Sequence, residues 1–175
     1  SEITNEAIST SEISSPVSIR INDATISASV KSQITNEFNK ILSLLDFNAS
    51  CSDIFRHWYV DGKLLYHIII NSADPKKGIV ELRPIEPTRI QKVREVKLIK
   101  DEATGAEYQE TLAEYFVYTQ GTVNSPYTTV NYGQSVAGLK ISTDSIVFVP
   151  SGLLDASRTR HISNLHKAIK PVNQL

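Results

Sequence analysis

Residues 61–84, with the sequence DGKLLYHIIINSADPKKGIVELRP, decide the class of fold. The opening Asp-Gly pair is a strong turn signal, and residues 64–70 are apolar and rich in β-branched side chains, which favours a buried strand. Residues 73–78 contain a proline and a glycine and predict a second turn. Residues 79–85 predict another strand, which we expect to lie at a sheet edge or end early because proline cannot donate a ladder hydrogen bond.

More strands are predicted after this stretch. Side chains alternate between two sets over residues 93–99, as they do along a strand. Short apolar runs predict three further strands, over 115–118, 139–141 and 146–149. Between them, residues 120–138 are polar and contain several glycines, and we expect a loop or a hairpin with a loose tip. Strands therefore dominate the middle of the chain.

Helices are predicted on both sides of the strands. Apolar residues recur every three or four positions from Ile26 to Leu45, which predicts a helix whose wide apolar stripe packs against a sheet. The pattern becomes helical again from Ser157, and Pro171 marks a kink or a boundary there. Shorter elements are predicted at three places: a helix over residues 1–9, a strand over 17–21, and a helix ending at Trp58 that Ser52 or Asp53 caps.

This order of elements predicts an α+β fold, with a mixed or antiparallel sheet packed by the amphipathic helix and a further helix at the C-terminal end. The composition, 41% hydrophobic and 21% charged, is ordinary for a globular domain with a real core. No apolar run approaches the roughly 18 residues that would predict a transmembrane helix. Cys51 is the only cysteine, which excludes an internal disulfide and a cysteine metal site.

Charge is segregated along the chain, although the net charge is only −1. Residues 51–100 carry ten basic and six acidic side chains, whereas residues 101–150 carry one basic and six acidic ones. Residues 1–50 are acidic, with three basic and six acidic side chains, and residues 151–175 are basic, with four against one. Because acidic and basic blocks alternate, the pattern suits protein–protein contact at least as well as a grip on DNA phosphates.

Two functions remain as alternatives, a metal-dependent nuclease and a nucleic-acid-binding adaptor. Glu95 and Lys97, two apart on a predicted strand, together with Asp74 upstream, resemble the groups with which a nuclease holds Mg²⁺ and orients water. The simpler interpretation is an exposed strand face with paired charges. The second alternative is a nucleic-acid-binding adaptor that uses two basic sets: Arg83, Arg89, Lys92, Arg94, Lys97 and Lys100, and then Arg158, Arg160, Lys167 and Lys170. No cofactor or metal site is predicted.

Several longer stretches resemble the portal vertex protein of T-even-like, contractile-tailed phages. The resemblance covers roughly residues 51–118 and 146–175. Over residues 17–48 the pattern of residue types is similar but fewer amino acids are identical, and the resemblance is weakest over residues 119–140. The matching stretches are FRHWYVDG (55–62), DPKKGI (74–79), ELR (81–83), VRE (93–95), EYF (114–116), SGL (151–153), LHKAIKP (165–171) and NQL (173–175).

The resemblance implies a structural protein without catalytic activity of its own. Portals of this family form twelve-fold homo-oligomeric rings at one vertex of the phage head. They nucleate capsid assembly, dock the packaging motor, let DNA pass, and later join the head to the neck and tail. The implied partners are the major capsid protein, the motor and the neck proteins, and the implied location is the virion, after assembly in the host cytoplasm. Residues 1–156 would form the wing domain, and residues 157–175 would begin the helix that leads toward the stem.

We expect the basic segment Arg83–Lys100 to contact the acidic segment Asp101–Glu114. The contact can form within one chain as a hairpin, which is the simpler version, or with the next subunit of a ring. The candidate subunit-interface residues are Arg83, Arg89, Lys92, Arg94, Lys97, Glu107, Glu110 and Glu114.

Overall fold

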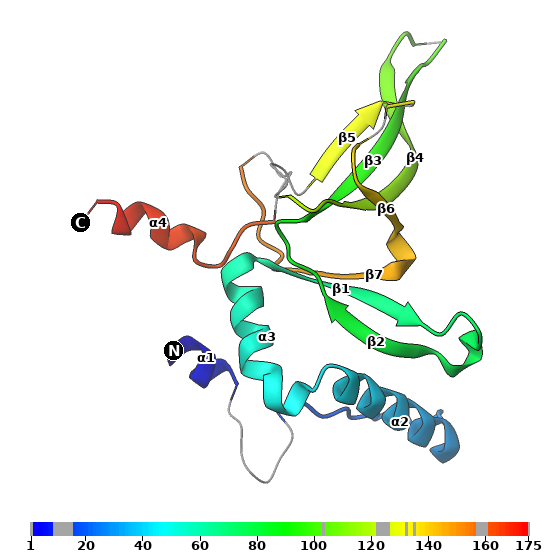
Figure 1. The fold of residues 1–175 in the computed structure, drawn as a ribbon, viewed down its shortest axis with the longest axis vertical. Helices are drawn as coiled ribbons and strands as arrows, with labels where there is room; N and C mark the ends of the chain where they lie inside the picture. Colours follow the sequence, from blue (N-terminus) through cyan, green and yellow to red (C-terminus); the bar gives the residue numbers. More distant parts are fainter. Residues whose placement is uncertain are drawn as a thin grey trace.

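The computed structural model describes residues 2–8, 16–102, 104–121, 127–131, 133–134, 136–156 and 161–174. The α+β class is confirmed (Figure 1), because the chain combines helices with one antiparallel and one mixed sheet, and α2 and α3 lie beside the antiparallel one. The helices are α1 (Glu2–Ala7), α2 (Ala28–Leu44), α3 (Phe47–Asp61) and α4 (His166–Val172), with short 3-10 turns at Pro75–Lys77 and Thr143–Ser145. The strands are β1 (Lys63–Ile70), β2 (Ile79–Pro84), β3 (Ile90–Lys100), β4 (Glu107–Tyr118), β5 (Tyr127–Asn131), β6 (Leu139–Ser142) and β7 (Ile146–Pro150).

The strands form two sheets rather than one. In the first sheet β1 lies between β2 and β7 and is antiparallel to both. The second sheet has the order β5-β3-β4-β6, in which β3 is antiparallel to β4 and parallel to β5. β2 is an edge strand, as its closing prolines predicted.

Two apolar clusters make up the core. The first joins the sheets, because Leu65 of β1 and Ile146 of β7 pack with Ile90 of β3 and Phe116 of β4. The second cluster contains Val93 of β3, with Tyr115, Val117 and Val130. Ile90 and Val93 are an odd number of positions apart on one strand, so they point to opposite faces of the second sheet. β3 is therefore buried on both faces, with Ile90 1% and Val93 0% exposed.

α2 and α3 are separated by a single sharp turn. The hydroxyl of Ser27 accepts a hydrogen bond from the Val30 amide at 3.4 Å and caps the start of α2. Asp46 then adopts a left-handed backbone conformation with φ of 46°, which redirects the chain into α3. The Ser50 hydroxyl lies 2.8 Å from the carbonyl oxygens of both Leu45 and Asp46, and it shares its one proton between them, which ties the first turn of α3 to the end of α2.

The predicted helices are present with different bounds. α3 begins at Phe47, before the caps expected at Ser52 or Asp53, because the turn at Asp46 starts it. The helical pattern expected from Ser157 gives a helix only from His166; residues 157–160 lie outside the described part, and His161 is held in an isolated bridge with Leu154. α2 was expected to bury its stripe on a sheet, but no residue of α2 is buried, and α2 makes only limited contact with β2.

The strand predictions need two corrections. Residues 17–21 form no described strand, because no described strand lies beside them to complete a ladder. The loop expected over 120–138 contains β5, which pairs in parallel with β3 instead of returning as a hairpin. Strands β3 and β4 are also longer than predicted, because their charged ends pair with each other across the two strands.

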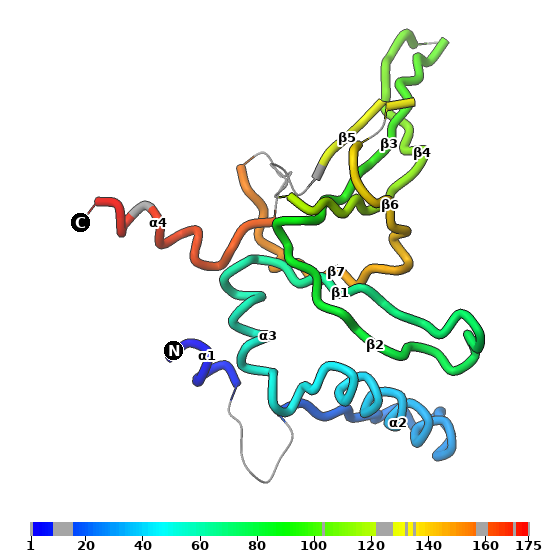
Figure 2. Tube along the Cα trace, in the orientation of Figure 1, coloured from blue at the N-terminus to red at the C-terminus, as the bar shows by residue number. Residues whose placement is uncertain are grey.

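The C-terminal segment is fastened to the end of α3 at Gly62. Gly62 ends α3 with φ of 73°, and its carbonyl accepts a hydrogen bond from the Ser151 amide at 2.8 Å. The Cα trace in Figure 2 lets the reader follow the chain from β7 past this point into α4. A β-carbon on Gly62 would lie 2.5 Å from the carbonyl oxygen of Ile162, closer than atoms can approach. Only glycine fits this joint.

Gly62→Ala should destabilise the chain much more than Gly152→Ala. Both glycines have positive φ, 73° and 80°, but a β-carbon at Gly152 meets nothing within 4 Å. Gly152→Ala should therefore lower the free energy of unfolding by about 1 kcal/mol, from backbone strain alone, and Gly62→Ala by roughly 2–4 kcal/mol. Urea denaturation followed by Trp58 fluorescence measures both. Equal losses would show that the contact with Ile162 is unimportant.

Candidate functional site

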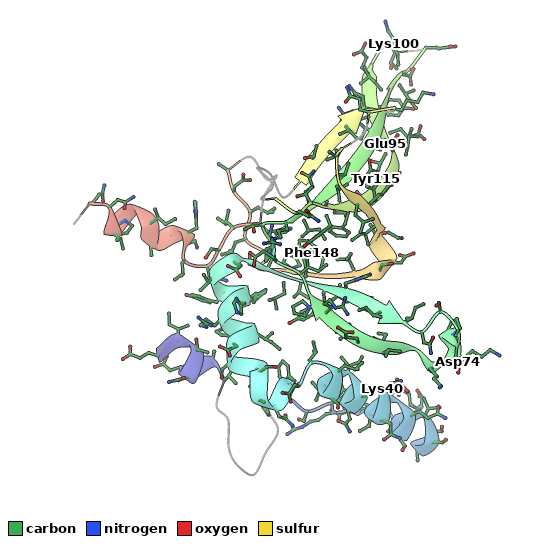
Figure 3. The ribbon with its side chains drawn as sticks, in the orientation of Figure 1. Lys40, Asp74, Glu95, Lys100, Tyr115 and Phe148 are labelled. Carbon is green, nitrogen blue, oxygen red and sulfur yellow. The ribbon has the colours of Figure 1, made fainter. Side chains whose placement is uncertain are left out.

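The β3–β4 hairpin reaches beyond both of its neighbours. β5 pairs with β3 only over residues 92–96, and β6 pairs with β4 only over 115–118. Residues 97–100 and 107–110 pair with each other and with no other described strand. This end of the hairpin, residues 97–110, is here called the arm. Figure 1 shows the hairpin extending at the top of the molecule, and Figure 3 places Lys100 at its tip.

The register of β3 and β4 brings the basic and acidic segments face to face. Arg94 lies opposite Glu114, and further out Lys97 lies opposite Glu110 and Lys100 opposite Glu107. The Glu114 carboxylate accepts from Lys92 Nζ at 2.6 Å and from Arg94 Nε at 3.1 Å. The expected contact between the two segments therefore forms within one chain, as the hairpin version predicted.

Glu114 is the acceptor that joins this cluster. Its hydrogen bond from Lys92 does most to lower its pKa below the ordinary value of 4.5, and Arg94 lowers it further, while partial burial opposes both. Glu114 and Lys92 have the same strand parity as Phe116 and Ile90, so the ion pairs continue the face on which the first core cluster lies. The charges begin along the hairpin where the core ends.

The eight predicted interface residues do not form one surface. Arg83 lies in the other sheet, on the edge strand β2, where it donates to Glu81 at 2.9 and 3.1 Å. Those contacts raise the pKa of its guanidinium further. Arg89 lies exposed just before β3. Lys97, Glu107 and Glu110 lie exposed on the arm, and the remaining three, Lys92, Arg94 and Glu114, form the ion-pair cluster.

Sequence reasoning missed that the hairpin also exposes apolar side chains. Leu98 and Tyr108 on the arm are 58% and 53% exposed, and Leu112 at the base of the arm is 43% exposed. Tyr108 and Leu112 were missed because β4 was predicted to begin only at Tyr115. The signal was present, since residues 107–114 carry the acidic partners that the basic end of β3 requires in a hairpin.

The groups of the nuclease alternative are not brought together. Figure 3 shows Asp74 at the turn between β1 and β2, and Glu95 within β3 of the other sheet. Asp74 instead pairs with Lys77 Nζ, 3.8 Å away in the same short turn. Within the described ranges, no three His, Cys, Asp or Glu side chains are grouped to hold a metal ion.

The two basic sets of the adaptor alternative differ in structure. The set in and near β3 faces acidic partners, as the pairs at Arg83, Lys92 and Arg94 show. In the C-terminal set Lys167 lies in α4, whereas Arg158 and Arg160 lie outside the described residues. Phosphate contact by the first set would have to compete with carboxylates that the fold already supplies.

Two basic side chains with lowered pKa values, Lys63 and His161, lie near the joint at Gly62. Burial lowers the pKa of Lys63, and the nearby carboxylate of Asp61 partly offsets this effect. Burial also lowers the pKa of His161, and the positive charge of Lys63 adds to this. The ring of His161 packs edge-on against Phe148, with centroids 5.7 Å apart. The ring contact between His161 and Phe148 fastens the C-terminal segment to β7.

Comparisons with known proteins agree with the resemblance seen in the sequence. The family model of the bacteriophage T4-like portal protein (Gp20) matches residues 1–175, the whole chain. The chain therefore belongs to the T4-like portal protein family. It is 34% identical over 176 residues to the portal protein of Vibrio phage KVP40, and 28% identical over 179 residues to the portal protein of Salmonella phage ViI. These alignments cover 99% of this chain but 34% and 32% of the relatives, so the chain spans about a third of their length.

None of the helices in the described part of the chain is both long and apolar enough to cross a bilayer.

Glu114→Gln should lower stability at neutral pH and have no effect in acid. Because the folded state lowers the pKa of Glu114, its stabilisation is complete above the unfolded-state pKa of about 4.3 and is lost as the pH falls through the folded-state pKa. We expect a loss of about 0.5–1 kcal/mol at pH 7, since the pair is partly exposed. Urea denaturation of the parent and of Glu114→Gln, from neutral to acidic pH, measures this difference in the free energy of unfolding.

The matched control is Glu110→Gln, which removes a carboxylate opposite Lys97 further out on the arm, where no close ion pair is formed within the described residues. That change should alter the free energy of unfolding by less than about 0.5 kcal/mol. If the two variants were equally destabilised, the cluster around Glu114 would have no special role.

Proposed function

We propose that this chain is part of a structural subunit of a phage portal ring at the head vertex. In this role it serves the nucleation of capsid assembly, the passage of DNA during packaging, and the joining of head and tail. The observation that carries the proposal is the family match over residues 1–175. The ring would be a homo-oligomer, with twelve copies in the complete protein.

Charge supports a structural role in a DNA conduit. Packaging requires DNA to slide, and a protein that neutralises many phosphates binds DNA tightly instead. The net charge of −1 and the carboxylates that face the basic residues of β3 both reduce that tendency. DNA would therefore pass through the assembled ring without being held firmly by this part of the protein.

The proposal also names partners and a place in the particle. The subunit would contact its own copies, the major capsid protein, the packaging motor and the neck proteins. It would reside in the virion at the head vertex, after assembly in the host cytoplasm. Residues 1–156 would form the wing, and residues 157–175 would lead toward a stem, with α4 as the helical part of that segment.

A cyclic ring requires two different complementary patches on each subunit. From the predicted interface set, we assign subunit contact to Arg89, Lys97, Glu107 and Glu110, whose side chains are exposed. Arg83 is a weaker candidate because Glu81 holds its guanidinium. Lys92, Arg94 and Glu114 would stiffen the base of the arm rather than meet another chain. Leu98 and Tyr108 add apolar surface to the same contact.

The proposed subunit does no catalysis of its own. The nuclease alternative loses support because Asp74 and Glu95 lie in different sheets. The adaptor alternative loses support because the basic residues of β3 face carboxylates. Neither alternative is favoured by a specific contact among the described residues.

Negative-stain imaging of the protein that contains this chain and its natural continuation tests the proposal. We expect rings with a central hole, because a subunit with two complementary patches closes into a cyclic oligomer. A uniform monomer at concentrations of several micromolar would contradict the proposal.

An activity assay is the companion measurement. Incubation of plasmid DNA with Mg²⁺ should leave the plasmid intact for both the parent and Glu95→Ala. Cleavage by the parent that Glu95→Ala abolishes would revive the nuclease alternative. A steep salt dependence of DNA affinity would instead support the adaptor.

A further inference from the structure

A groove of about 590 Å³ lies between the helices and the first sheet. The end of α2, one side of α3, and strands β1 and β2 line it. Its floor is apolar, with Leu45, Ile54, Leu65, Leu82 and Ile85 among the lining side chains. A groove of this size and lining takes either a small molecule or one face of a short helix.

The rim of the groove is acidic. Asp46, Asp53, Asp61 and Glu86 line it, and its described lining includes no lysine or arginine. His57 also lines it and lies 3.5 Å from Asp61. Asp53 has Arg56 as a neighbour at 3.3 Å, but the other side of this exposed pair is open to solvent. An occupant should therefore be apolar on one face and basic overall.

α4 has this character. Leu165, Ile169 and Val172 are spaced as i, i+4 and i+7, so they lie along one face of a helix. They are 40%, 52% and 64% exposed, so the rest of the described chain does not cover this face. Residues 156–175 carry four basic side chains and no acidic one. This i, i+4, i+7 spacing of anchors is typical of helices that dock in apolar grooves.

The α4 of the same chain points away from the groove. Asn164 and Ser163 are held at the end of α3, where the Asn164 amide and the Ser163 hydroxyl both donate to the Tyr59 carbonyl at 3.2 Å. From there α4 extends on one side of α3, while β1 and β2 lie on the other side (Figure 1). The α4 of the same chain therefore does not fill the groove.

We propose that α4 of a second copy of this chain docks in the acidic groove between α3 and the β1–β2 strands. The contact joins two different surfaces, so it is heterologous, and repeated copies close into a ring when the rotation permits. The inference rests on the proposed ring and names two complementary patches for it, the acidic groove and the apolar face of α4. The residues of this contact, in α4 and in the groove, are not among the eight subunit-interface residues predicted from the sequence.

Disulfide trapping in the intact protein tests which chain fills the groove. One tagged version carries Asp53→Cys at the rim, and a second version with a different tag carries Ile169→Cys, with other reactive cysteines replaced by serine. Cys51 is buried and 1% exposed, so a parent with Cys51 alone serves as the control. After mixing and mild oxidation, a disulfide-linked product with both tags is expected, and each version alone should give little.

Two substitutions on opposite faces of α4 provide a second measurement. Ile169→Glu places a carboxylate against the apolar floor and acidic rim, and should weaken self-association by about tenfold or more in sedimentation velocity. Lys167 is two positions from Ile169, so it lies on the far side of the helix. Lys167→Glu introduces a glutamate on this far side of α4, and it should weaken self-association by less than about threefold.

The outcomes separate this inference from the proposed function. Mixed-tag product with rings supports both, and mixed-tag product in small oligomers without rings supports the docking but contradicts the ring. Rings without mixed-tag product overturn the docking and leave the ring standing. A variant with both cysteines that forms only an intrachain disulfide overturns the docking, as does equal weakening by Ile169→Glu and Lys167→Glu.

Discussion

The double burial of β3 is the constraint on which the rest of the structure depends. Ile90 faces the cluster between the sheets and Val93 faces the cluster on the other side. A slip of β3 by one residue would put Lys92 or Arg94 in the place of the fully buried Val93, which opposes the slip. That fixed register aligns β4 beside it and sets Arg94 opposite Glu114. The position of the arm, and of each charge on it, follows from two apolar side chains near its base.

The joint at Gly62 has a comparable role for the C-terminal segment. The backbone of Ile162 approaches Gly62 too closely for any side chain there, and Ser151 and Ser163 fasten the segment with hydrogen bonds to Gly62 and Tyr59. The joint determines the direction in which α4 leaves the molecule. Since that direction is away from the acidic groove, the joint keeps α4 of the same chain out of the groove.

Segregated charge is used in two ways. Lys92 and Arg94 of β3 pair with Glu114 of β4 within one chain, where they stiffen the base of a ribbon of two strands that would be marginal alone. The carboxylates around the groove lie outside this hairpin, on the α2–α3 and β2 side of the molecule. They and the basic residues after Ala156 are the two groups of opposite charge that the proposed contact between copies would join.

The sequence by itself determined the α+β class, the amphipathic helix ending near Leu45, the edge position of β2 and the pairing of opposite charges around Glu114, because these follow from local periodicity, proline chemistry and charge. The sequence stretches that resemble the portal family also indicated a portal protein. Only the tertiary structure decided that β5 is a strand, that residues 17–21 are not, and that Asp74 lies far from Glu95. It also decided that the groove and α4 face different directions. These depend on which distant segments meet, and a polar stretch such as 127–131 becomes a strand only because the edge of β3 offers it unpaired hydrogen-bonding groups.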